Sequence, residues 1–166
     1  DKFEAALAVP EGENAAPRLN TALAALERRR SGLPLEQKQK LLLVNNWNHG
    51  PVLSADEQKR CLDRIEPELT KVRESSKRPH FWIKRDFSLP TTVLFPEYAR
   101  LRYSAQVCSA MATYHARRGQ TSKATEALRD VFQFSKLAGD SPSTLIAGLV
   151  SIALYNIGIE GVVRCI

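Results

Sequence analysis

The feature that most constrains this sequence is a run of nineteen residues without a charged side chain, from Ser141 to Ile159. Such a run is just long enough for a helix to cross a bilayer. However, it begins with a Ser-Pro pair typical of a helix start, and Gly148, Ser151 and Asn156 dilute its apolar character. Its flanks carry neither an aromatic belt nor a lysine cluster. We therefore expect a buried helix, and no membrane span within this chain.

The apolar residues of this run recur at helical spacing and cover more than half of the helix circumference. A helix of this breadth should be buried on most sides, so something must cover both of its faces. A neighbouring chain or a segment beyond Ile166 would provide that cover. The residues that we expect to face a partner are Leu145, Leu149 and Leu154.

Helical patterns also fill most of the remaining chain, in which Ala and Leu dominate the apolar residues. Asn14 as a cap and Pro17 in the first turn predict the start of one helix. Ser54 and Glu57 have the spacing of a capping box and predict the start of another. Pro67 falls inside this second helix, which either kinks there or ends so that a new helix begins.

The order of these patterns predicts one all-α domain of about six helices over residues 1–166. N-terminal helices occupy 1–78, with a short helix at 33–47 among them. An extended connector without helical period follows over 79–95, and antiparallel helical hairpins fill 96–158. A chain of 166 residues is long enough to bury a core of its own.

The segment 108–142 loosely resembles one tetratricopeptide helical pair. Ala112 takes the small position of its first helix, Gly119 the turn, and Ala124 with Leu128 the paired positions of its second helix. The closing proline comes about six residues later than in that repeat, and no second copy follows at the 34-residue period. The resemblance implies tetratricopeptide-like packing of a hairpin without a regular array.

Most of the chain resembles a family of uncharacterised all-helical proteins from bacteria with large genomes. The resemblance lies in Asn-Ala-Ala at 14–16, a connector that contains Trp82, and an Ala/Leu/Arg-rich helical pair. The pair ends in the family's Pro-x-Leu-Ile run, here Pro-Ser-Thr-Leu-Ile at 142–146. The turn at 119–121 departs from the Gly-Asp-Tyr type of the family. The resemblance implies an all-helical fold and brings no activity with it.

The strongest charge feature is the segment 71–85, which carries six basic residues and one acidic residue, a net charge of +5. Two aromatic residues lie inside it, so cations flank rings that can stack on bases. One interpretation is a surface for RNA, single-stranded DNA or anionic lipid. The interpretation that we favour is that Phe81 and Trp82 anchor the connector while the cations are solvated. The possible contacts to nucleic acid or another anion are Lys71, Arg73, Lys77, Arg78, Trp82, Lys84 and Arg85.

Residues that could carry chemistry are scattered along the chain. Cys61, Cys108 and Cys165 are odd in number and widely spaced, so we expect reduced thiols rather than disulfides or a zinc site. The sequence has no Gly-x-Ser-x-Gly turn and no phosphate-binding glycine loop. We therefore expect no metal, no cofactor and no catalytic residue. An enzyme would need a cleft that gathers distant groups such as His80, Asp86 and His115.

The predicted function is a non-enzymatic scaffold or protein-interaction module that binds a protein partner or a second copy of itself. The alternative is a nucleic-acid or anion-binding domain centred on 71–85. Because the chain begins with Asp1 rather than Met, we expect that it was processed or excised from a longer protein. The sequence does not indicate the cellular compartment of the protein.

Overall fold

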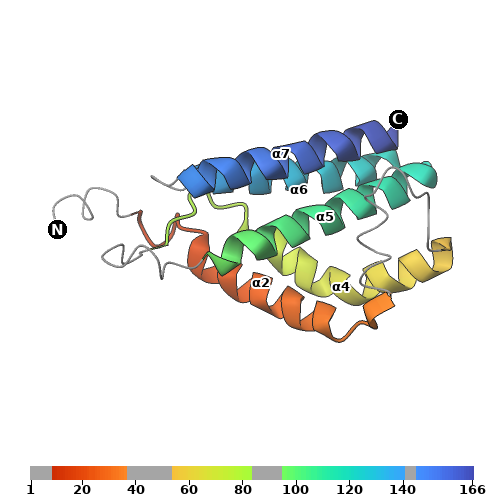
Figure 1. Cartoon of the computed structure of the whole chain (residues 1–166), viewed down its shortest axis with the longest axis horizontal. Coiled ribbons are helices and arrows are strands. Elements are labelled where there is room, and N and C mark those ends of the chain that lie inside the picture. The colour runs from red at the N-terminus through yellow and green to blue at the C-terminus, as the bar shows by residue number, and fades with distance from the viewer. Residues whose placement is uncertain (1–8, 37–53, 84–94, 141–144) are drawn as a thin grey trace.

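The computed structural model describes residues 9–36, 54–83, 95–140 and 145–166. These ranges contain no strand, and only Asn14 and His80 form an isolated β-bridge. The all-α prediction is confirmed, and five described helices are close to the six expected. The predicted helix at 33–47 lies largely outside the described residues. The helices are α2 (Ala16–Ser31), α4 (Ala55–Ser75), α5 (Pro96–Arg117), α6 (Thr121–Gly139) and α7 (Leu145–Cys165) (Figure 1).

Local signals mark the starts of the first two helices. Pro17 lies in the first turn of α2 as predicted, whereas the N-cap is Ala15 rather than Asn14. Oδ1 of Asn14 accepts a hydrogen bond from the backbone N–H of Ala16 at 3.0 Å. Ser54 and Glu57 make the predicted capping box at the start of α4. This helix continues through Pro67, so an end at the proline, one of the two options, is wrong. Residues before and after the proline share one buried face that supports the helix, namely Leu62, Ile65, Leu69 and Val72.

The central helix is α5, which contacts α2 and α4 on one side and α6 and α7 on the other (Figure 1). Both of its faces are buried, with Leu101 and Cys108 on one and Met111 and Tyr114 on the other. Its small residues let the neighbouring helices approach closely. The fully buried alanines of α5 are Ala105, Ala110 and Ala112.

The predicted helical hairpins are present in the C-terminal half. The turn between α5 and α6 contains Gly119, whose φ of 69° lies in the left-handed region that glycine adopts without strain. The last helix runs on to Cys165, beyond the predicted end of the hairpins at residue 158. This last part of the helix contains two charged residues, Glu160 and Arg164. Nη2 of Arg164 donates to Oε2 of Glu160 one turn earlier at 3.2 Å, a pairing that supports a helix.

The buried apolar side chains of all five helices form one continuous cluster. Ion pairs also connect the N-terminal helices to the C-terminal ones. Nε of Arg73 lies 2.6 Å from Oδ2 of Asp130, which joins α4 to α6. Nε of Arg100 donates to Oε2 of Glu27 at 2.7 Å, which joins α5 to α2. The position of α7 is set by the core, which includes its residues Ala147 and Leu154.

Candidate functional site

The last helix, α7, lies along the edge of the molecule opposite α2 and α4 (Figure 1). One side of it is exposed, with Leu145 at 80% and Ile152 at 61%. Among the described residues, all large apolar side chains that are exposed lie on this side of α7, except Leu35. We call this set the outer face of α7: Leu145, Ile146, Leu149, Ile152, Tyr155, Ile159, Val163, and Ile166 directly after the helix.

The prediction that α7 is buried on most sides is wrong for the single chain. Its inner face packs on α5 and α6 and includes Ala147 and Leu154, both at most 1% exposed. We expected Leu154 to face a partner, but it belongs to the core, whereas Leu145 and Leu149 lie on the outer face. The error has a physical reason. Helical spacing assigns residues to faces, but it does not give the number of helices available to cover them.

Small residues hold the inner face close to α6. A Cβ atom built on Gly158 would lie 2.7 Å from Cε1 of Phe132, so a larger residue would require the ring or the helix to move. Ser135 and Ser151 each donate their hydroxyl to the backbone carbonyl of the other, both at 2.9 Å. These contacts fix the rotation of α7 about its axis and therefore direct the outer face toward solvent.

A groove of about 290 Å³ between α5 and α7 continues the outer face. Its walls are mainly apolar, and Arg102 on α5 is the one charged residue among those that line it. The apolar surface therefore extends from α7 toward α5. The lining residues are Tyr98, Ala99, Arg102, Ile146, Leu149, Val150, Ala153 and Leu154.

Among the described helices, α7 is also the one that is long and apolar enough to cross a membrane. This criterion concerns length and composition alone, and a core helix of a soluble protein meets it too. The outer side of α7 also carries polar groups. Asn156 is exposed, and so is Glu160, whose side chain is 63% exposed where it pairs with Arg164.

Two arginines of the basic segment 71–85 make contacts inside the fold. The side chains of Arg73 and Asp130, paired at 2.6 Å, are only 19% and 18% exposed. Burial raises the pKa of Asp130, and the Arg73 guanidinium opposes this rise. Nη1 of Arg78 donates to the carbonyl oxygens of Glu11 at 3.1 Å and Asn14 at 3.0 Å. Both guanidinium groups therefore hold segments of the chain together, a role that we did not predict for them.

Of the other predicted contacts of this segment, three lie in the described part of the chain. Lys71 is exposed and donates to Glu68 on the same helix at 2.9 Å, and Lys77 is exposed as well. Trp82 is half-buried. The remaining two, Lys84 and Arg85, lie outside the described residues. Nucleic-acid or anion binding by this segment stays a prediction.

Asn14 fastens the connector to the start of α2, a role that the sequence analysis missed. Its Oδ1 accepts from the backbone N–H of Trp82 at 3.1 Å, and its Nδ2 donates to the Trp82 carbonyl at 2.9 Å. The residue before Trp82 is Phe81, which is 1% exposed and lies against Tyr98 of α5. This burial supports the interpretation of Phe81 as an anchor. The sequence signal that could have indicated the contact between Asn14 and Trp82 is that an Asn-Ala-Ala start and a Trp-containing connector occur together.

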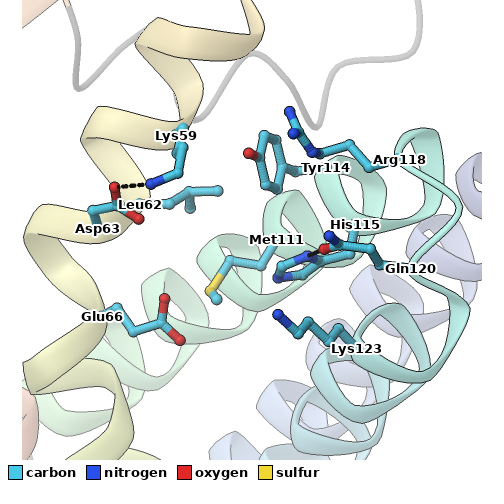
Figure 2. Close-up of a pocket in the computed structure, with 10 residues that line it drawn as sticks. All are labelled: Lys59, Leu62, Asp63, Glu66, Met111, Tyr114, His115, Arg118, Gln120 and Lys123. Atoms are coloured by element: carbon cyan, nitrogen blue, oxygen red, sulfur yellow. Dashed lines mark hydrogen bonds and ion pairs between the residues drawn. The ribbon is translucent and has the colours of Figure 1, made fainter.

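A second concave site, of about 270 Å³, lies between α4 and the region where α5 turns into α6 (Figure 2). On its α4 wall, Lys59 and Asp63 form an ion pair. On the opposite wall, Nδ1 of His115 lies 2.7 Å from Oε1 of Gln120. The site mixes cations with carboxylates and shows no preference for one sign of charge. The other lining residues are Leu62, Glu66, Met111, Tyr114, Arg118 and Lys123.

This second site does not gather the groups that an enzyme was expected to need. His115 lines the site opposite Lys59, which lies near the start of α4, whereas His80 follows the end of that helix. The length of α4 between Lys59 and Ser75 is roughly 24 Å, so the two imidazoles are far apart. Asp86 lies outside the described residues. Within the described ranges, no three His, Cys, Asp or Glu side chains are grouped so that they could hold a metal ion.

The three thiols lie in or near the core. Cys61 and Cys108 are buried, and Cys165 is half-buried. Burial raises the pKa of Cys108 to about 12, and it also raises the pKa of Cys61 and of Cys165. A thiol that stays protonated at neutral pH is a poor nucleophile, so these side chains contribute packing.

Comparison with protein-family models, with curated proteins and with solved structures finds no match to this chain. The resemblance to an uncharacterised bacterial family therefore stays a prediction. Among the described residues, the outer face of α7 contains all the large exposed apolar side chains except Leu35.

Proposed function

We propose that this protein is a non-enzymatic helical interaction module and that the outer face of α7 binds a protein partner. One observation carries the proposal: large apolar side chains stay exposed along the whole of α7 while its opposite side is buried. Soluble monomers rarely expose continuous apolar patches larger than a few hundred Å². Covering such a patch contributes about 25 cal/mol for each Å² removed from water, which favours association.

The rigid attachment of α7 supports this role. Its inner face is held by the close approach of Gly158 to α6 and by the paired hydroxyls of Ser135 and Ser151. A partner would therefore meet a surface that is already ordered, so little conformational entropy is lost when it binds. The groove beside Arg102 widens this surface and gives it one charged edge.

Photocrosslinking tests the proposal. We would replace Leu149 on the outer face by benzoylphenylalanine and irradiate cells that produce the protein. The matched control carries the same group at Lys71, whose side chain is 60% exposed on α4. We expect adducts of protein mass from position 149 alone, and we expect Ile152→Asp to remove them. The absence of a protein adduct at 149, or equal adducts from both positions, would contradict the proposal.

A further inference from the structure

The outer face of α7 contains a heptad repeat that runs over the entire helix. Seven positions alternate in steps of four and three residues, which gives the average spacing of 3.5 found along the seam of a coiled coil. All seven are exposed, and six of them are apolar. The seam positions are Leu145, Leu149, Ile152, Asn156, Ile159, Val163 and Ile166.

The same seven-residue repeat also describes how α7 attaches to its own core. Ala147, Leu154 and Gly161 are spaced by seven and occupy the heptad position opposite the seam, and all three are buried. The seam therefore points directly away from α5 and α6. A helix partner can approach it without displacing the helices on which α7 rests.

We infer that the seam pairs with α7 of a second copy of this chain, which makes the protein a dimer through two such helices. This inference rests on the proposed function and names the partner. A straight seam spaced by 3.5 residues fits another helix with the same spacing, and a second copy provides it. Beyond α7, the described residues expose one further large apolar side chain, Leu35, so they offer no second apolar face for this seam.

Asn156 is the observation that favours an identical partner. It is the fourth of the seven seam positions, with three apolar residues on either side. Two seams that overlap fully, whether parallel or antiparallel, bring Asn156 of one copy against Asn156 of the other. A carboxamide both donates and accepts, so two copies can satisfy one another by hydrogen bonds. Single asparagines at such positions set register and oligomeric state in coiled coils, at a cost in stability.

The exposed area is sufficient for a reversible dimer. Six large seam side chains are between 43% and 102% exposed, and together they offer several hundred Å². A standard interface buries roughly 800 Å² on each partner, and smaller ones are typical of weak or transient complexes. We therefore expect a dimer that dissociates on dilution. A lipid surface fits less well, because the exposed carboxamide of Asn156 would lose water without gaining a partner.

Sedimentation equilibrium from low to several hundred micromolar tests the inference. We expect a mass that rises from 18.5 kDa toward twice that value. Ile152→Asp in the seam should weaken dimerisation about a hundredfold by burying a charge. The control is Leu35→Asp, the same change at a side chain that is 69% exposed outside α7, and it should leave dimerisation unchanged. Asn156→Leu should strengthen association about tenfold, because the polar layer is removed.

Asn156→Cys gives a second measurement that is independent of affinity. Under mild oxidation it should form a disulfide-linked dimer, whereas Lys71→Cys on α4 should not. A chain that is monomeric throughout, or a dimer that Ile152→Asp does not weaken, overturns the inference. If crosslinking at Leu149 in cells still gives protein adducts, the proposed function survives with a different partner. Flotation with phosphatidylcholine vesicles that is lost in Ile152→Asp would overturn both.

Discussion

Gly158 provides a sharp test of how α7 is held, because it lies in close contact with Phe132 of α6. A Cβ atom added at this position would lie 2.7 Å from Cε1 and 2.8 Å from Cζ of Phe132. Carbon atoms in favourable contact are about 3.5–4.0 Å apart, so Gly158→Ala requires the ring or the helix to move. The ring of Phe132 also contacts the ring of Tyr155 edge to face at 5.4 Å, so moving it would disturb a second contact.

The expected magnitude follows from two opposing effects. Alanine in place of glycine inside a helix stabilises the folded chain by about 0.5–1 kcal/mol, because alanine loses less conformational entropy than glycine when the chain folds. Overpacking a close contact costs about 1–3 kcal/mol. We therefore expect Gly158→Ala to lower the free energy of unfolding by roughly 0.5–2 kcal/mol. Gly148 on the same helix has no atom within 4 Å of a built Cβ, so Gly148→Ala should raise the free energy of unfolding instead.

Urea unfolding followed by circular dichroism measures both changes, at one protein concentration low enough to keep the chain monomeric. A third variant, Gly158→Ala with Phe132→Leu, replaces the obstructing ring by a smaller side chain and should show a positive coupling of about 1 kcal/mol. The reasoning is refuted if Gly158→Ala is as stable as Gly148→Ala. It is also refuted if the two changes at 158 and 132 are additive.

Three further predictions concern the core, the internal ion pair and the connector. Leu154→Ala should lower the free energy of unfolding by about 2–5 kcal/mol, because this leucine is fully buried. The same change at Leu149 on the outer face should lower the free energy of unfolding by less than about 1 kcal/mol, measured at a concentration where the chain is monomeric. Asp130→Ala should lower the free energy of unfolding by roughly 1.5–3 kcal/mol, because Arg73 then keeps only its longer ion pair with Glu66 at 3.7 Å, and a double variant that also carries Arg73→Met should regain part of it. Asn14→Ala should cost about 2 kcal/mol, since three hydrogen bonds are lost. Chemical denaturation checks each value. An Asp130→Ala variant as stable as the wild type would contradict the pairing with Arg73, and equal losses at Leu154 and Leu149 would contradict the two faces of α7.

Much of the fold could be read from local patterns. Ser54 and Glu57 identified the start of α4 because a capping box satisfies backbone groups within four residues. Gly119 identified the turn between α5 and α6 because few other residues adopt its positive φ. Pro67 was ambiguous, since the effect of a proline inside a helix depends on packing from other segments. That packing came from the buried face that residues 62–72 share with the rest of the core.

The candidate site divides in the same way. The sequence by itself determined that α7 forms and that it is apolar over most of its circumference, because these properties depend on residue order and helical spacing alone. Only the tertiary structure decided that Leu154 packs inward while Leu149 faces water. It also decided that Arg73 pairs with Asp130 instead of contributing to a basic patch. Which side of a helix is covered depends on how many other helices reach it, and that depends on contacts between residues far apart in the chain.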